Sequence, residues 1–232
     1  MQEKTFKAVI PQSWSEVTLE KYLKYRKTID MYKDDDEDEG PDKSLLIALD
    51  ILCEIPPTYL PSLSLDKIKL INDDLNSFMS KSDFELQRFI TIDGIEYGFE
   101  PNLSEMSYGA YLDISKNDTI GMDKNWPKIM AILYRKVAKK ELNKAGDTKY
   151  YEIENYTGKE DDAPFLKTGM DVNFGCMFFF INFSRDLLQS TMKSLMESEE
   201  IQPALSSIMG KNGEAIRQLL NSPMGTSLNS MK

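Results

Sequence analysis

Residues 92–137 read IDGIEYGFEPNLSEMSYGAYLDISKNDTIGMDKNWPKIMAILYRKV, and along them the local folding signals agree with the hydrophobic pattern. Two short alternating runs flank Asp93-Gly94, a dipeptide that accepts the positive φ angles of a tight hairpin turn. Asn102, with Glu105 three residues later, is typical of a helix start. We therefore expect a β-hairpin, then helical structure, with the core of the fold around them.

A second helix start follows at Asn125, because Pro127 would lie in the first turn, where a missing N–H has no cost. The pattern predicts a helix that passes Val137 and ends at Gly146. Its apolar face would carry Trp126, Ile129, Met130, Leu133 and Val137. The basic segment 135–144, RKVAKKELNK, would then be a solvated helix face, with a nucleic-acid-binding patch as the alternative.

Further elements are predicted on both sides of this stretch. Three helices precede it, and their first turns lie near Thr18, near Ser44 and near Ser64 or Asp66. Alternation in KYYEIENYTG, residues 149–158, indicates a strand. From Val172 a phenylalanine-rich apolar run is too long for a strand, so we expect a helix there.

These elements predict an α+β fold that is predominantly helical. It would have a helical core, a small antiparallel β-hairpin or sheet, and a flexible C-terminal tail. Residues 1–196 are expected to form a single domain with an acidic loop at 34–41. Residues 197–232, rich in Ser, Asn, Gly and Met, are expected to be a tail or assembly arm that becomes ordered on a partner.

The composition argues against most kinds of catalytic site. The chain has no histidine, which excludes histidine-based nucleophilic catalysis and histidine-ligated metal sites. The two cysteines, Cys53 and Cys176, lie far apart in apolar runs and are expected to be buried thiols in a reducing compartment. Neither glycine-rich phosphate-binding motif occurs. We therefore expect no enzyme activity, no cofactor and no metal.

The acidic run DDDEDEG at 34–40 is not a calcium-binding EF-hand loop. With Asp35 as the first loop position, Gly40 falls at the sixth, but Leu46 occupies the twelfth, which needs a bidentate glutamate. A second acidic feature, Asp161-Asp162, is the basis of a weaker hypothesis, a carboxylate-dependent hydrolase. Adjacent carboxylates on a loop point apart, so this is the least favoured function.

Charge and hydropathy limit the partners. The 232-residue chain has a formal net charge of -10 and a pI near 4.7, a surface that repels nucleic-acid phosphate. The longest apolar cluster is shorter than a membrane span, and no apolar leader follows the start. We expect no membrane association, no specific nucleic-acid binding, and assembly in a cytoplasm.

Five segments, in order, carry a family resemblance: IPQSWSEVTLEKYLKY (10–25), IDGIEYGFEPNLSEMSYGAYLDI (92–114), KIMAILYRKV (128–137), YYEIENYTG (150–158) and the phenylalanine-rich helix. Between about Val9 and Met196 the chain resembles a small virion protein of crAss-like tailed bacteriophages. Proteins of this kind are ring components of the portal-tail connector, or tail barrel. The resemblance implies a homo-oligomeric ring of twelve-fold symmetry that contacts the portal protein and other tail ring proteins. DNA would pass through this ring during ejection.

Two further expectations complete the hypothesis. The alternative function is a phage tail-assembly chaperone that is not retained in the virion. In either case aromatic side chains and an arginine would supply partner contacts. The residues predicted at such an interface are Trp14, Trp126, Tyr134, Arg135 and Phe179. For the two tryptophans the competing interpretation is a position in the core.

Overall fold

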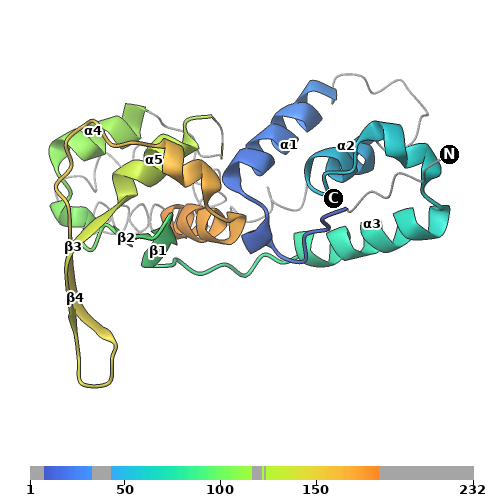
Figure 1. The fold of residues 1–232 in the computed structure, drawn as a ribbon. Coiled ribbons are helices and arrows are strands. Elements are labelled where there is room, and N and C mark those ends of the chain that lie inside the picture. Colours follow the sequence, from blue (N-terminus) through green and yellow to red (C-terminus); the bar gives the residue numbers. More distant parts are fainter. Residues whose placement is uncertain (1–7, 33–42, 117–121, 123, 183–232) are drawn as a thin grey trace, which may run out of the picture. The chain divides into compact units, whose positions relative to one another are not determined.

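The computed structural model describes residues 8–32, 43–116, 122 and 124–182. The chain divides into two compact units, Met1–Phe180 and Ile181–Lys232, and nearly all described residues belong to the first. In the described part, helices and one four-stranded antiparallel sheet form an α+β fold in which helical residues predominate (Figure 1). The predicted fold class is therefore confirmed. The acidic loop at 34–41, the tail at 197–232 and the expected boundary between residues 196 and 197 lie outside the described residues.

The N-terminal part is helical, as the sequence predicts. Its elements are η1 (Trp14–Glu16), α1 (Leu19–Tyr32), α2 (Lys43–Ile51), η2 (Pro57–Ser62) and α3 (Leu65–Met79). Thr18 caps α1, since its Oγ1 accepts the backbone N–H of Lys21 at 3.3 Å. Ser64 caps α3 in the same way by accepting the N–H of Lys67. Ser44 lies inside the first turn of α2, two residues after the N-cap position.

The predicted hairpin forms around Asp93-Gly94. Strands β1 (Phe89–Ile92) and β2 (Ile95–Phe99) pair antiparallel. Asp93 has φ of 50° and Gly94 has φ of 80°, so both central residues adopt the left-handed conformation that a two-residue hairpin turn needs. Local turn chemistry alone was enough to predict this element.

Two helices follow β2. Asn102 accepts the N–H of Ser104 at 3.2 Å and begins η3 (Leu103–Glu105), which leads into α4 (Tyr108–Lys116). Helix α5 (Trp126–Leu133) has proline in its first turn, as predicted.

The predicted continuation of α5 to Gly146 is wrong. The helix ends at Leu133, and the chain enters strand β3 (Tyr134–Leu142), which pairs antiparallel with β2 and with β4 (Thr148–Ile153). Alanine, lysine and glutamate favour helix in isolation. Pairing with β2 at residues 134–136 and with β4 from Val137 to Leu142 overrides that preference, which makes this a tertiary effect. Gly146, with φ of 91°, lies in the turn between the two strands.

The sheet has the order β1-β2-β3-β4. Gly98 of β2 lies close to side chains of β4, although β3 separates these two strands in the sheet. A Cβ atom there would lie 2.9 Å from Cγ2 of Ile153 and 3.1 Å from the Tyr151 ring, so the position has no room for a side chain. This contact joins three strands of the sheet at one point.

The last described elements complete the core. Strand β4 is followed by η4 (Ala163–Lys167) and by a helix over residues 170–182, in agreement with the predicted phenylalanine-rich helix. The N–H of Leu19 donates to the carbonyl of Thr168, and the N–H of Met170 donates to the carbonyl of Val17, each at 2.9 Å. These bonds join the start of α1 to the start of the C-terminal helix.

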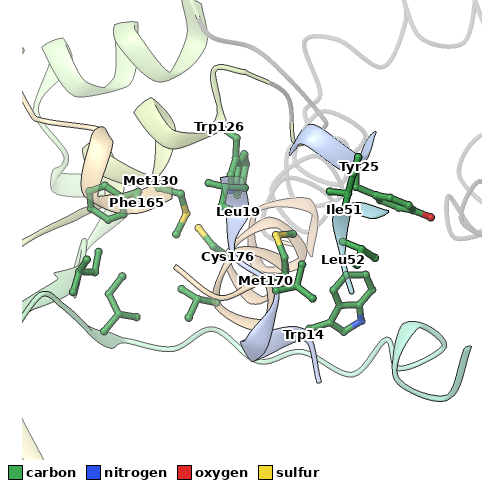
Figure 2. Packing of buried hydrophobic residues seen from close by; sticks show 14 of the residues in the cluster. Trp14, Leu19, Tyr25, Ile51, Leu52, Trp126, Met130, Phe165, Met170 and Cys176 are labelled. Atoms are coloured by element: carbon green, nitrogen blue, oxygen red, sulfur yellow. The ribbon is translucent and has the colours of Figure 1, made fainter. Parts of the chain in front are cut away.

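One cluster of buried apolar side chains runs through these elements (Figure 2). Cys53 and Cys176 are both buried free thiols, as predicted. Burial raises the pKa of Cys53 to about 11 and also raises the pKa of Cys176. Both thiols are therefore protonated near neutral pH, which makes them poor nucleophiles.

Candidate interaction surface

The two tryptophans predicted at an interface lie in the core of the chain. Trp14 is 7% exposed and packs edge-to-face against Phe78 and Phe174, with ring centroids 5.2 and 4.9 Å apart. Trp126 is 4% exposed, and its Nε1–H donates to Oδ1 of the buried Asn173 at 2.9 Å. Their packing within the chain agrees with the competing interpretation as core residues, and a contact with a partner stays a prediction.

The other three predicted residues lie close together where β3 leaves α5. Tyr134 is buried, and its hydroxyl donates to the carbonyl of Gln87 at 2.7 Å. The Phe99 ring contacts the rings of Tyr134 and Phe179 edge-to-face, at 5.2 and 5.4 Å between centroids. Phe179 is half-buried. These aromatic residues pack the base of the sheet.

Arg135 forms a buried ion pair with Glu100. The two side chains are 9% and 10% exposed, and a guanidinium nitrogen of Arg135 donates to the carboxylate. The Nε of Arg135 has no hydrogen-bond partner. This ion pair links β3 to the end of β2, so Arg135 stabilises the sheet. Its role at an interface with a partner stays a prediction.

The β3–β4 hairpin extends beyond the sheet (Figure 1). Strand β2 pairs with β3 only at residues 134–136, so residues 137–153 form a two-stranded ribbon, and we call its residues 137–150 the arm. Residues 138–147 are all exposed, including Leu142 at 59%, and Tyr150 near the base is 47% exposed. An isolated two-stranded ribbon is marginally stable in water. The arm therefore gains little stability from the rest of its own chain.

The turn of the arm has a defined geometry. Oδ1 of Asn143 accepts the N–H groups of Ala145 and Asp147 at 2.8 and 2.9 Å. The N–H of Asn143 donates to the carbonyl of Asp147 at 2.8 Å. Because these bonds are local, the turn keeps its shape without help from another element.

The lysines of the arm fall into two groups. Lys139 pairs with Glu141 at 2.9 Å, and Lys140 pairs with Glu96 at 2.7 Å while lying 3.8 Å from the centroid of the Phe89 ring. Lys144 and Lys149, nearer the turn, are exposed and have no ion-pair partner within the described part of the chain. The arm carries four lysines and two acidic residues, and with Glu152, which pairs with Lys139 in the register, the whole ribbon 137–153 has a net charge of +1 in a chain whose total is -10.

A second surface has the opposite character. We call residues 105–116 and 157–162 the α4 surface; it contains five acidic residues and two lysines. Tyr156 joins the two segments, because its hydroxyl donates to Oδ2 of Asp113 at 2.5 Å. This bond and Lys116 hold the pKa of the Asp113 carboxyl below its usual value, so the group stays ionised at neutral pH.

Two exposed tyrosines lie on the same surface. Tyr108 and Tyr111 are 74% and 58% exposed, and their rings stack with centroids 6.4 Å apart. An exposed aromatic pair on a surface that also carries carboxylates suits a cationic partner, since the ring faces and the carboxylates both attract ammonium groups.

The described residues offer little for catalysis. A cavity of about 360 Å³ lies beside β1, and its lining has one carboxylate, Asp93, which pairs with Lys167 at 2.5 Å. Asp161 accepts the N–H of Ala163, and Asp162 begins η4, so these adjacent carboxylates lie at the start of a short helix. Among the described residues, no three Cys, Asp or Glu side chains are grouped to bind a metal ion. None of the described helices has the length and apolarity to span a bilayer.

Comparisons of the chain with protein-family models, with curated proteins and with solved structures found no match.

The arm is the feature that the sequence interpretation missed, although one signal for it was present. A six-residue alternating strand directly after an Asn-Lys-Ala-Gly-Asp turn needs a pairing partner, and the preceding residues are the nearest one. The apolar stripe of α5 hid this signal, because Val137 continues the helical spacing four residues past the true end of the helix at Leu133.

Proposed function

We propose that this protein is a structural ring subunit of the portal-tail connector of a short-tailed bacteriophage, part of the conduit for DNA ejection and retained in the virion. The observation that carries the proposal is the arm, a two-stranded ribbon exposed on both faces that projects beyond the sheet. Projecting ribbons of this kind suit a subunit that must reach a neighbour. The family resemblance supplies the type of assembly.

A closed ring needs two different surfaces on each subunit, because head-to-tail contacts join unlike faces. The positively charged arm and the acidic, tyrosine-bearing α4 surface differ in this way. The net charge of -10 also suits a conduit, since an acidic wall does not retain phosphate as DNA passes. Ring subunits act by shape and contact, in keeping with a proposed function that includes no catalysis.

The test is quantitative mass spectrometry of purified mature virions, with the portal protein as the internal reference. A fixed small-integer ratio of this chain to the portal protein is the expected result. Abundance in infected-cell lysate together with absence from virions would overturn the ring and favour a tail-assembly chaperone.

A further inference from the structure

We propose that the arm of one copy docks on the α4 surface of a neighbouring copy of the same chain, and that this contact closes the ring. The inference rests on the proposed ring function and names the partner that the arm binds. The arm and the α4 surface would then be the two unlike faces of a head-to-tail contact.

Most of the arm is exposed, and of its side chains Lys140 reaches back to Glu96 and the Phe89 ring. Beyond residue 136 its β3 strand has β4 on one side and, among the described residues, no strand on the other. Leu142 and Tyr150 are exposed, and the turn is held in shape by its own hydrogen bonds. A preorganised ribbon with exposed side chains binds without first having to fold, which lowers the entropic cost of docking.

Charge selects the partner. The ribbon 137–153 that contains the arm has a net charge of +1, so the remainder of the chain carries -11, and any second copy presents a predominantly acidic surface. The α4 surface has a net charge of -3 from five acidic residues and two lysines. Complementary patches of this kind speed encounter and set orientation.

The chemistry of the α4 surface fits the tip of the arm. Lys144 and Lys149 need carboxylates or ring faces, and Asp113, Glu160 and the stacked Tyr108 and Tyr111 supply both kinds of group. Glu160 is held by Thr157, whose N–H donates to its Oε1 at 2.6 Å, so this carboxylate is already in place.

The contact must be made between copies. Figure 1 shows the arm running away from α4, with its turn at the far end from that helix. The two surfaces of one chain therefore cannot meet each other. A second copy can bring its α4 surface to the arm while its own arm stays free for a third, which is the condition for a ring.

The test uses the full-length chain and measures its association by sedimentation velocity at low salt. Lys144→Glu with Lys149→Glu should weaken self-association at least about tenfold, and Tyr108→Ala with Tyr111→Ala should do the same. The matched control is Lys67→Glu with Lys69→Glu on α3, which makes the same change in net charge at exposed positions and should leave association unchanged. Circular dichroism should show that all these variants keep the wild-type fold.

Charge exchange separates a specific contact from a general charge effect. Adding Glu105→Lys and Asp162→Lys to the reversed arm should restore association, because the reversed arm then meets a reversed surface. Failure of this restoration, or association that is insensitive to the arm variants, would overturn the proposal.

Carbodiimide cross-linking of mixed ¹⁴N- and ¹⁵N-labelled chains identifies the contact directly. Mixed-isotope links should join Lys144 or Lys149 to the carboxylates of the α4 surface. Links elsewhere only, or a chain that stays monomeric at every concentration, would overturn the arm contact. The virion copy number would still decide the ring function separately, so the two proposals fail in distinguishable ways.

Discussion

The base and the outer part of the β3–β4 hairpin belong to the same two strands but have opposite environments. At the base, Tyr134 and Arg135 are buried and Tyr151 donates its hydroxyl to the carbonyl of Phe99 at 2.8 Å. The preceding residue, Tyr150, is 47% exposed and lies with Glu152 on the face opposite Tyr151. Its hydroxyl donates to the Glu152 carboxylate. The base obtains its stability from its own chain, whereas the outer part has contacts left to make. Substitutions at the base should therefore lower the stability of the chain, whereas substitutions in the outer part should weaken its association with other copies.

The largest expected effect is at the base. Glu100→Ala should lower the free energy of unfolding by about 3–5 kcal/mol, because it leaves the buried guanidinium of Arg135 without its carboxylate. Urea unfolding measures the change. The paired replacement Glu100→Leu with Arg135→Met should lose much less, since it removes both charges together. A loss below about 1 kcal/mol for Glu100→Ala, the range of exposed ion pairs, would contradict the buried environment.

An effect of intermediate size is expected at Gly98. Gly98→Ala places a methyl group 2.9 Å from Cγ2 of Ile153 and should destabilise the chain by about 1–3 kcal/mol through overpacking. Thermal unfolding followed by circular dichroism would measure it. Combination with Ile153→Ala should cost less than the sum of the two single changes, because the second change removes the clash. Strict additivity would show that β4 does not approach β2 at this point.

Small stability effects are expected on the arm. Leu142→Ala and Tyr150→Ala should each change the free energy of unfolding by no more than about 0.5 kcal/mol, because both side chains are largely in solvent. The same variants should weaken self-association. A large loss of stability in the monomer would mean that the arm packs on its own chain, and the contrast with the base would disappear.

The finest comparison is the pH dependence of the two adjacent tyrosines. Burial raises the pKa of Tyr151 above the value of about 10 for an unfolded chain, so the folded state holds this proton more tightly. Its contribution to stability is thus present below about pH 10 and is lost as the pH rises above it. Urea unfolding between pH 9 and 11 should show a shallower alkaline decline for Tyr151→Phe than for wild type.

Tyr150→Phe is the matched control for that measurement. The pKa of Tyr150 is raised first by its hydrogen bond to Glu152, on the exposed side of the ribbon. Solvent screens this exposed hydrogen bond, so Tyr150→Phe should reduce the alkaline decline less than Tyr151→Phe does. If the two variants behaved alike, the base and the arm would not differ in solvent access at these neighbouring positions.

Local chemistry made much of the fold predictable. The hairpin at Asp93-Gly94, the caps at Thr18 and Ser64, and proline in the first turn of α5 each depend on a few consecutive residues. The burial of Cys53 and Cys176 followed from the apolar runs around them. In each case the residues that determine the local structure lie within about one helical turn or one strand pair of each other. A short stretch of sequence therefore shows all of them.

The candidate surface was much less predictable. Aromatic character marked Trp14 and Trp126 as contact residues, but the same character also packs cores, and the structure places both rings in the core. Lys139 and Lys140, in the segment 135–144, were assigned to the correct solvated environment but to a helix instead of strand β3. Exposure depends on neighbours distant in sequence, and composition along one segment does not specify them.

The sequence by itself determined the helix starts, the first hairpin, the buried thiols and the acidic net charge, because each depends on adjacent residues or on totals. Only the tertiary structure decided that the chain leaves α5 at Leu133 and forms the arm. Residues 135–144 favour helix locally, and pairing first with β2, up to residue 136, and then with β4, from residue 137, outweighs that preference. These pairings bring together residues that lie up to about forty positions apart, at a cost in chain entropy that only the assembled sheet offsets.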